Sequence, residues 1–271
     1  MMLLIDAGNT RIKIGWVKPD TGERETQALA LEHGALEQLP AWLQQLDDRP
    51  RAALGVSVAQ PGVAASLDAL LQRHYAFAAR WIQGEPQAAG VRNAYDMPAQ
   101  LGADRWASML GLVQRATRDT PLMLASFGTA TTLDTLSPIH DTAMPGARFL
   151  FEGGLIFPGP ALMLSSLAAG TARLPQANGP IAAYPTHTHQ AISSGIAAAQ
   201  AGALLRQWRE GLERHGCAPA VFSTGGGWTI VEEEAQRTLA RAQADLGVPQ
   251  DPIQWLRAPV LDGLARLAVE S

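Results

Sequence analysis

Hydrophobic residues along the chain follow two spacings, one typical of strands and one typical of helices. In the first part, short apolar runs predict strands at residues 3–5, 12–17, 22–31, 52–58 and 77–82. Helical spacing relates Leu36, Leu39, Leu43 and Leu46, and it returns between residues 67 and 75. Strands that alternate with helices in this way indicate an α/β layered architecture.

The alternation continues in the rest of the chain after a polar connection at residues 83–103. We expect strands at residues 122–125, 131–136, 153–160 and 220–223. We expect helices at residues 106–113, 161–167, 196–212, 231–244 and 260–267. A stretch rich in Pro, Thr, Gly and His, residues 170–190, predicts a loop.

The first two strands enclose a short polar turn that contains Gly8 and Asn9. Such a turn can direct several backbone N–H groups at one point, and glycine lets an anion approach closely. Asp6 is placed to hold a magnesium ion, while Thr10 and Lys13 offer a hydroxyl and a cation to phosphate oxygens. The alternative is an ordinary hairpin with a capping aspartate.

The same layout returns about 120 residues later along the chain. Residues 125–129 repeat the order of residues 5–9: a strand end, a short polar residue, a spacer, a glycine and a small polar residue. This repeat predicts a duplicated domain with one phosphate-facing hairpin in each half. Chance similarity between two short hairpins is the alternative.

Composition narrows the class of protein. The 271 residues are 47% hydrophobic and carry a formal net charge of −4, so the chain can bury a large core but offers no basic surface for nucleic acid. The single cysteine, Cys217, allows no intrachain disulfide and no cysteine-based zinc site. We expect neither a signal peptide nor a membrane span, because there is no basic leader and no apolar run of about 18 residues. We therefore expect a cytoplasmic protein.

Two further stretches carry candidate chemistry. Asp104 and Arg105 open the helix predicted at 106–113, where free N–H groups and Arg105 suit an anionic substrate group and Asp104 can accept a proton. The alternative is an acid that only complements the helix dipole and pairs with Arg105. After the strand at 220–223, the consecutive glycines 225–227 let the backbone approach a nucleotide base or ribose, although a simple turn has the same pattern.

Five motifs in this order together resemble type III pantothenate kinase. They are Leu-Ile-Asp-x-Gly-Asn-Thr at 4–10 with Lys13, Leu-Gly-x-Asp-Arg at 101–105 after Tyr95, Phe-Gly-Thr-Ala-Thr-Thr at 127–132, Gly-Gly-x-Ile-x-Pro-Gly at 153–159, and Thr188 followed by Ala-Ile-Ser-Ser-Gly at 191–195.

This resemblance implies two ribonuclease-H-like domains, residues 1–117 and 118–271, in the actin-like ATPase fold shared with acetate and sugar kinases, with ATP in the cleft between them. It implies ATP-dependent phosphorylation of pantothenate, the first step towards coenzyme A, with Asp104 as the catalytic base. The pantothenate contacts would be Tyr95, Gly102, Ala103, Asp104, Arg105 and Thr188. The ATP contacts would be Asp6, Ala7, Gly8, Asn9, Thr10, Arg11, Ile12, Lys13, Thr129, Gly225 and Gly226, with Mg²⁺ at Asp6.

The resemblance also implies a homodimer, because Thr188 would reach pantothenate in the neighbouring subunit. Two positions depart from the family. Ser126 stands where members commonly carry an acid that binds a monovalent cation, which weakens any requirement for potassium or ammonium, and His187 stands where relatives often carry Asn. Asp134 is the nearest acid along the chain, and it could contact such a cation, face solvent or cap a turn.

Two other functions fit the same residues. Some members of the family were described as accessory regulators of gene expression, so a regulator with little kinase activity is the second reading. A third is another kinase or phosphatase on the same scaffold, because a fold alone does not fix a substrate.

Overall fold

The computed structural model describes residues 1–116, 119–140 and 146–270. The chain divides into two compact units. Unit 1 comprises Met1–Ala116, Ile139–Phe151 and Ala258–Ser271, and unit 2 comprises Thr117–Pro138 and Glu152–Arg257.

The compact units differ from the continuous halves 1–117 and 118–271 expected from the sequence. A short segment, Ile139–Phe151, and the end of the chain, Ala258–Ser271, belong to unit 1. The expected boundary at 117 and 118 lies outside the described residues. A division into two ribonuclease-H-like domains at that point stays a prediction.

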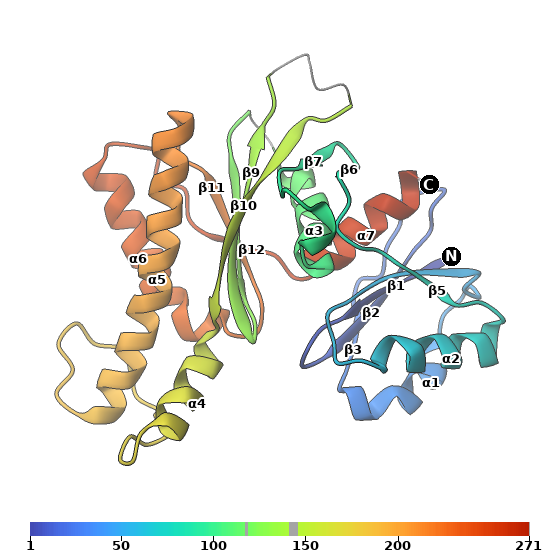
Figure 1. Ribbon diagram of the computed structural model, residues 1–271, viewed down its shortest axis with the longest axis horizontal. Coiled ribbons are helices and arrows are strands. Elements are labelled where there is room, and N and C mark those ends of the chain that lie inside the picture. Colours follow the sequence, from blue (N-terminus) through green and yellow to red (C-terminus); the bar gives the residue numbers. More distant parts are fainter. Residues whose placement is uncertain (117–118, 141–145, 271) are drawn as a thin grey trace. The chain divides into compact units, whose positions relative to one another are not determined.

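Unit 1 is built on a sheet in the order β3-β2-β1-β4-β5 (Figure 1). Its strands are β1 (Met2–Ala7), β2 (Ile12–Val17), β3 (Leu29–Leu31), β4 (Ala52–Ser57) and β5 (Ala79–Trp81). β1 is antiparallel to β2 and parallel to β4, as expected for a hairpin followed by a crossover helix. The strand expected at 22–31 is wrong for most of its length, because only β3 and a single bridge from Val17 to Arg24 form there.

Helices cover both faces of this sheet. α1 (Leu39–Leu43) and α2 (Val63–Tyr75) bury leucines against Leu3 and Ile5 of β1. α3 (Ala103–Leu112) packs against α7 (Pro259–Glu270), and both also contact β4. The helix expected at 36–46 begins instead as a 3-10 helix, η1 (His33–Gln38).

The connection expected at 83–103 contains short elements of its own. They are β6 (Gln87–Ala88), β7 (Val91–Asn93) and η2 (Pro98–Gln100), while η3 (Val113–Arg115) follows α3. β7 pairs in parallel with Phe149–Phe151, the first residues of β10 (Phe149–Pro158). This pairing brings the residues just before Tyr95 next to a strand far away in the sequence.

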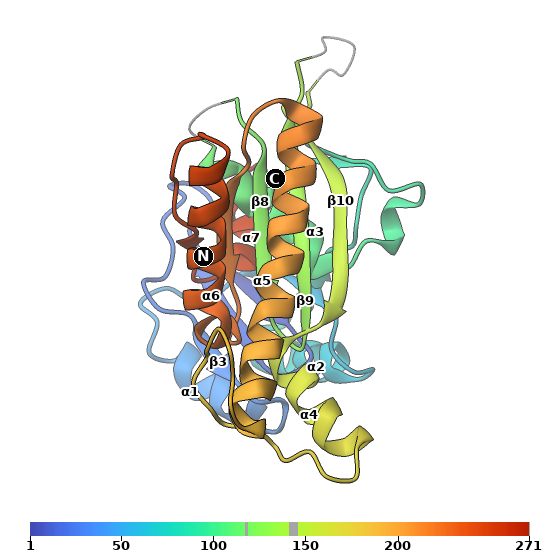
Figure 2. The ribbon, with the colours of Figure 1, turned by 90° about the vertical axis from the view of Figure 1, so that its left-hand side faces the viewer.

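Unit 2 contributes the strands β12-β11-β8-β9-β10 to a seven-stranded sheet, which continues along the first residues of β10 to β7 and β6. Its further strands are β8 (Leu122–Phe127), β9 (Ala130–Pro138), β11 (Ala220–Thr224) and β12 (Gln254–Trp255), and its helices are α4 (Pro160–Gly170), α5 (Thr188–His215) and α6 (Trp228–Asp245). Figures 1 and 2 show α5 and α6 side by side over one face of the sheet. α5 begins eight residues before the helix expected at 196–212.

The order of strands confirms the predicted duplication. Each unit has its first two strands as an antiparallel hairpin, and the first strand also pairs in parallel with a later strand: β1 with β4, and β8 with β11. Read from the hairpin side, β3-β2-β1-β4-β5 and β10-β9-β8-β11-β12 have the same order. Chance similarity of two hairpins does not produce five strands in one common order.

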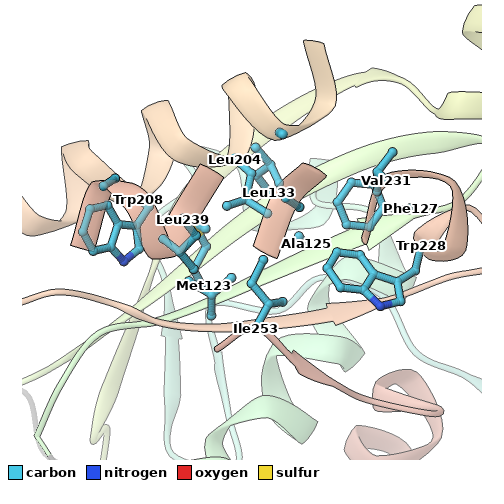
Figure 3. Packing of buried hydrophobic residues seen from close by; sticks show 14 residues of the cluster. Met123, Ala125, Phe127, Leu133, Leu204, Trp208, Trp228, Val231, Leu239 and Ile253 are labelled. Carbon is cyan, nitrogen blue, oxygen red and sulfur yellow. The ribbon is translucent and has the colours of Figure 1, made fainter. Parts of the chain in front are cut away.

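The hydrophobic core of unit 2 packs the β8–β9 hairpin against the helices α5 and α6 (Figure 3). Phe127 at the end of β8 is fully buried, and its ring lies 5.4 Å from that of Trp228 at the start of α6. Trp208 of α5 is also fully buried, and its indole N–H donates to the Pro219 carbonyl. In the part of the chain that the structure describes, no helix is long and apolar enough to cross a membrane.

Candidate functional site

The first candidate element is the turn between β1 and β2. The Gly8 N–H donates to the Arg11 carbonyl at 3.1 Å and closes the turn. Asn9, Thr10 and Arg11 are exposed, whereas the Ala7 and Ile12 side chains are fully buried. Of the predicted nucleotide contacts, Ala7 and Ile12 can therefore offer only backbone groups, while the turn residues can offer side chains as well.

Asp6 lies at the end of β1, directly across the hairpin from Lys13. Burial raises the pKa of the Asp6 carboxyl from 3.8 to about 6; the Lys13 ammonium lowers it, and the Asp104 carboxylate raises it further. The structure thus brings Asp6, Lys13 and Asp104 within electrostatic range of one another. A divalent cation fits two nearby carboxylates of this kind, because it would neutralise charge that burial disfavours.

Asp104 lies in the first turn of α3, as the sequence predicts. Its carboxylate accepts a hydrogen bond from the Arg105 backbone N–H at 2.8 Å. Burial raises the pKa of Asp104, while the Arg105 N–H, the Arg105 charge and the backbone N–H of Asp104 oppose that rise. A carboxylate with a raised pKa at a helix start is a stronger proton acceptor than a free aspartate.

Arg105 is buried, with 7% of its surface exposed, and its guanidinium lies beside a pair of stacked aromatic rings. Its guanidinium donates to the Tyr95 hydroxyl at 2.9 Å and lies 5.8 Å from each of the Tyr95 and Phe151 ring centres. The two rings stack at 5.7 Å. A guanidinium held in this way is poorly hydrated and suits recognition of a carboxylate.

Two residues of this cluster were not found from the sequence. Phe151 forms part of the β10 strand that pairs with β7, and nothing in its local pattern distinguishes it from an ordinary core residue. Asn93 is buried, and its side-chain amide oxygen accepts the Tyr95 backbone N–H at 3.0 Å. The sequence itself offers only an asparagine two positions before the candidate tyrosine, and burial of that asparagine is seen only in the structure.

The second candidate element is the turn between β8 and β9 in unit 2. Thr129 is exposed there, and its carbonyl accepts the Gly159 N–H at 2.9 Å. A Cβ on Gly159 would collide with the Gly128 carbonyl. Glycine at 159 therefore lets the end of β10 lie directly against the turn that carries Thr129.

The glycines after β11 reach the same turn. The Gly227 N–H donates to the Phe127 carbonyl at 2.8 Å. Gly225 has a φ of +96°, and a Cβ there would collide with the Phe127 backbone. Gly226 is exposed with open space around it, so its backbone is accessible. The structure thus brings Thr129, Gly225 and Gly226 together within unit 2.

Thr188 lies elsewhere in unit 2, at the first position of α5. His187 caps this helix, and its Nδ1 accepts the Gln190 N–H at 3.4 Å. Thr188 is exposed and lines a largely apolar groove of about 720 Å³ between α4 and α5. Its predicted substrate partners, Tyr95 and Asp104, belong to unit 1.

The candidate cation residues lie on the unit 2 hairpin. Ser126 is half-buried and faces Thr132 across the β8–β9 ladder. Asp134 is 1% exposed, so the suggestion that it faces solvent is wrong. No group of three or more His, Cys, Asp or Glu side chains that could hold a metal occurs among the described residues. A divalent ion held by Asp6 in unit 1 would therefore need oxygen ligands from the bound substrate as well.

Comparison with known proteins first gives the class. The activator of 2-hydroxyisocaproyl-CoA dehydratase from Clostridium difficile, solved with bound ADPNP, matches with a TM-score of 0.50 at 13% identity, covering 99% of this chain and 93% of that one. Together with the duplicated sheets, this likeness makes the protein a member of the actin-like ATPase fold.

The sequence comparisons then give the family. The family model of type III pantothenate kinase matches residues 2–210. The type III pantothenate kinase of Bordetella pertussis is 49% identical over 273 residues, covering 100% of this chain and 98% of the relative. That of Aromatoleum aromaticum is 38% identical over 270 residues, covering 100% and 98%. The chain belongs to the type III pantothenate kinase family.

Family membership confirms the activity expected from the sequence. The protein phosphorylates pantothenate with ATP in the first step of coenzyme A biosynthesis. A kinase of the actin-like ATPase fold implies a divalent metal together with ATP. The relatives that match over the full length of this chain are type III pantothenate kinases. This does not favour a regulator with little kinase activity or a kinase for another substrate.

Proposed function

We propose that Asp104 is the general base of pantothenate phosphorylation. The supporting observation is a carboxylate whose pKa is raised by burial, held at the start of α3 by the Arg105 N–H and close enough to Asp6 to affect its pKa. In the reaction, the terminal hydroxyl of pantothenate gives its proton to the Asp104 carboxylate. The hydroxyl oxygen bonds to the γ-phosphorus of ATP as the bond to the β–γ bridging oxygen breaks, and ADP leaves.

We propose that residues 6–13 hold the ATP phosphates. The turn offers backbone N–H groups, the Thr10 hydroxyl and the Lys13 ammonium, which are the donors that phosphate oxygens require. Mg²⁺ would bind at Asp6 and supply charge neutralisation to the phosphates. Thr129 and the exposed backbone of Gly225 and Gly226 would contact the rest of the nucleotide.

We propose that the carboxylate of pantothenate binds near Arg105. The guanidinium is shielded by Tyr95 and Phe151, so an ion pair with a carboxylate is screened less than at an open surface. Tyr95, Gly102 and Ala103 would line the same pocket. Thr188 would complete it from a second subunit, which makes the working unit a homodimer; sedimentation or light scattering measures this directly.

We propose two further properties of this kinase, its location in the cell and its dependence on monovalent cations. The protein acts in the cytoplasm, where its substrates ATP and pantothenate are available. Potassium or ammonium is at most a weak activator, because Ser126 carries no charge to bind such an ion. Kinase assays with and without either cation measure this.

The decisive experiment replaces Asp104 by asparagine, which has nearly the same shape and cannot accept the proton. We expect Asp104→Asn to lower kcat by about 10²-fold or more, with the affinity for ATP unchanged. Asp96→Asn is the matched control, because Asp96 is exposed near the same helix, and it should keep full activity. Unchanged turnover in Asp104→Asn would remove this residue from the role of base.

A further inference from the structure

His33 connects the first turn of η1 to the turn between β1 and β2. Its Nε2 lies 2.8 Å from the Gly8 carbonyl oxygen. A carbonyl oxygen only accepts hydrogen bonds, so Nε2 carries the proton and donates it. This contact lies in unit 1 and involves a residue that neither the motifs nor the pattern of the chain indicates.

The hydrogen bond fixes the orientation of one peptide group. In a trans peptide, the carbonyl of residue 8 and the N–H of residue 9 point in opposite directions. When His33 holds the Gly8 carbonyl, the Asn9 N–H is therefore directed away from η1. Gly8 has no Cβ to restrict rotation of this peptide, so the His33 hydrogen bond adds a restraint to that of the Gly8 N–H on the Arg11 carbonyl.

The chain on either side of η1 is held in the core of unit 1. Leu31, two residues before His33, pairs with Ile12 at the start of β2 and is buried. Leu39 directly after η1 is fully buried in the core of unit 1. His33 is thus anchored on both sides by core residues, and one of them pairs with the strand that leaves the turn.

We propose that His33 is a positioning residue for nucleotide binding, acting through the Gly8–Asn9 peptide on the phosphates of a nucleoside triphosphate. The inference rests on the proposed function in that residues 6–13 hold those phosphates. His33 itself touches no substrate. Its loss frees the peptide to rotate, and the Asn9 N–H then points at the phosphates for only part of the time.

The test compares His33→Leu with His33→Gln in the full-length protein. Glutamine places its amide nitrogen four bonds from Cα, as histidine does with Nε2, so it can restore the donor. We expect His33→Leu to raise KM for ATP about three- to tenfold, the worth of one hydrogen bond, while KM for pantothenate stays the same. His33→Gln should recover most of the loss. His140→Leu, at an exposed histidine, should behave as the unmodified protein.

Three results would overturn the inference. They are an unchanged KM for ATP in His33→Leu, equal rises in both KM values together with a lowered melting temperature, and a His33→Gln variant as impaired as His33→Leu. Lys13→Ala separates this failure from failure of the proposed function. If Lys13→Ala raises KM for ATP and His33→Leu does not, the turn binds ATP without help from His33. If neither changes it, the phosphate role of residues 6–13 fails.

Discussion

Asp6→Asn is expected to stabilise the free protein at pH 8 while removing its kinase activity. Burial raises the pKa of Asp6 from 3.8 to about 6, so the folded protein holds this proton more tightly than the unfolded chain does. Stability is therefore lost as the pH rises from about 4 to 6, and the full cost is present above pH 6. Each pKa unit is worth about 1.4 kcal/mol, which gives a cost of about 2 to 3 kcal/mol at pH 8.

Asparagine removes this cost because it has the shape of aspartate and does not ionise. At pH 8 the variant should be more stable by about 2 to 3 kcal/mol, or roughly 4 to 12 °C in melting temperature. At pH 4 Asp6 is protonated in the folded protein, so the two proteins should have nearly the same stability. The measurement is urea and thermal unfolding at both pH values, without nucleotide and with a chelator, since a bound cation would itself stabilise the ionised carboxylate.

Asp47→Asn is the matched control for loss of one negative charge. Asp47 is exposed in the same unit, so its replacement should change stability by less than about 0.5 kcal/mol at either pH. An Asp6→Asn variant that is no more stable than the unmodified protein at pH 8 would refute the reasoning. A gain of the same size at both pH values would also refute it, because the effect would then not come from ionisation.

Two further variants test the substrate pocket and the second hairpin. Arg105→Lys keeps the charge but loses the flat group that contacts the Tyr95 and Phe151 rings; we expect KM for pantothenate to rise about tenfold or more with KM for ATP unchanged, measured by steady-state kinetics. Gly159→Ala forces a Cβ against the Gly128 carbonyl, so we expect a less stable protein with weaker ATP binding, measured by thermal unfolding and nucleotide titration.

The sequence indicated those parts of the site that lie on one continuous stretch of chain. The β1–β2 hairpin and the start of α3 were predictable because apolar residues mark the strands and the helix face, and Asp6 and Asp104 stand where those patterns begin or end. The repeated layout at 5–9 and 125–129 also pointed to the duplication that the strand orders confirm.

Contacts between distant segments were not predictable in this way. The Phe151 ring lies against Tyr95 only because β10 pairs with β7, and the His33 ring reaches Gly8 only because β3 pairs with β2. The start of α5 was missed because the residues of its first turn, 188–191, are small or polar and mostly exposed. Periodicity detects buried faces, so it does not detect a helix start that faces solvent.

Asp6 and Asp104 differ in the groups that oppose protonation, and this difference suits two separate roles. Asp104 accepts the Arg105 N–H, lies at a helix start and feels the Arg105 charge, all of which favour the ionised form needed in a base. Asp6 feels the Lys13 charge from across the hairpin, but the Asp104 carboxylate opposes that effect. A divalent cation at Asp6 would therefore neutralise the repulsion between the Asp6 and Asp104 carboxylates, which Lys13 and Arg105 do not remove. Asp104 would not need to be protonated for this. Binding of the cation and ionisation of Asp6 are then one coupled event, so the metal should bind more weakly as the pH falls below about 6.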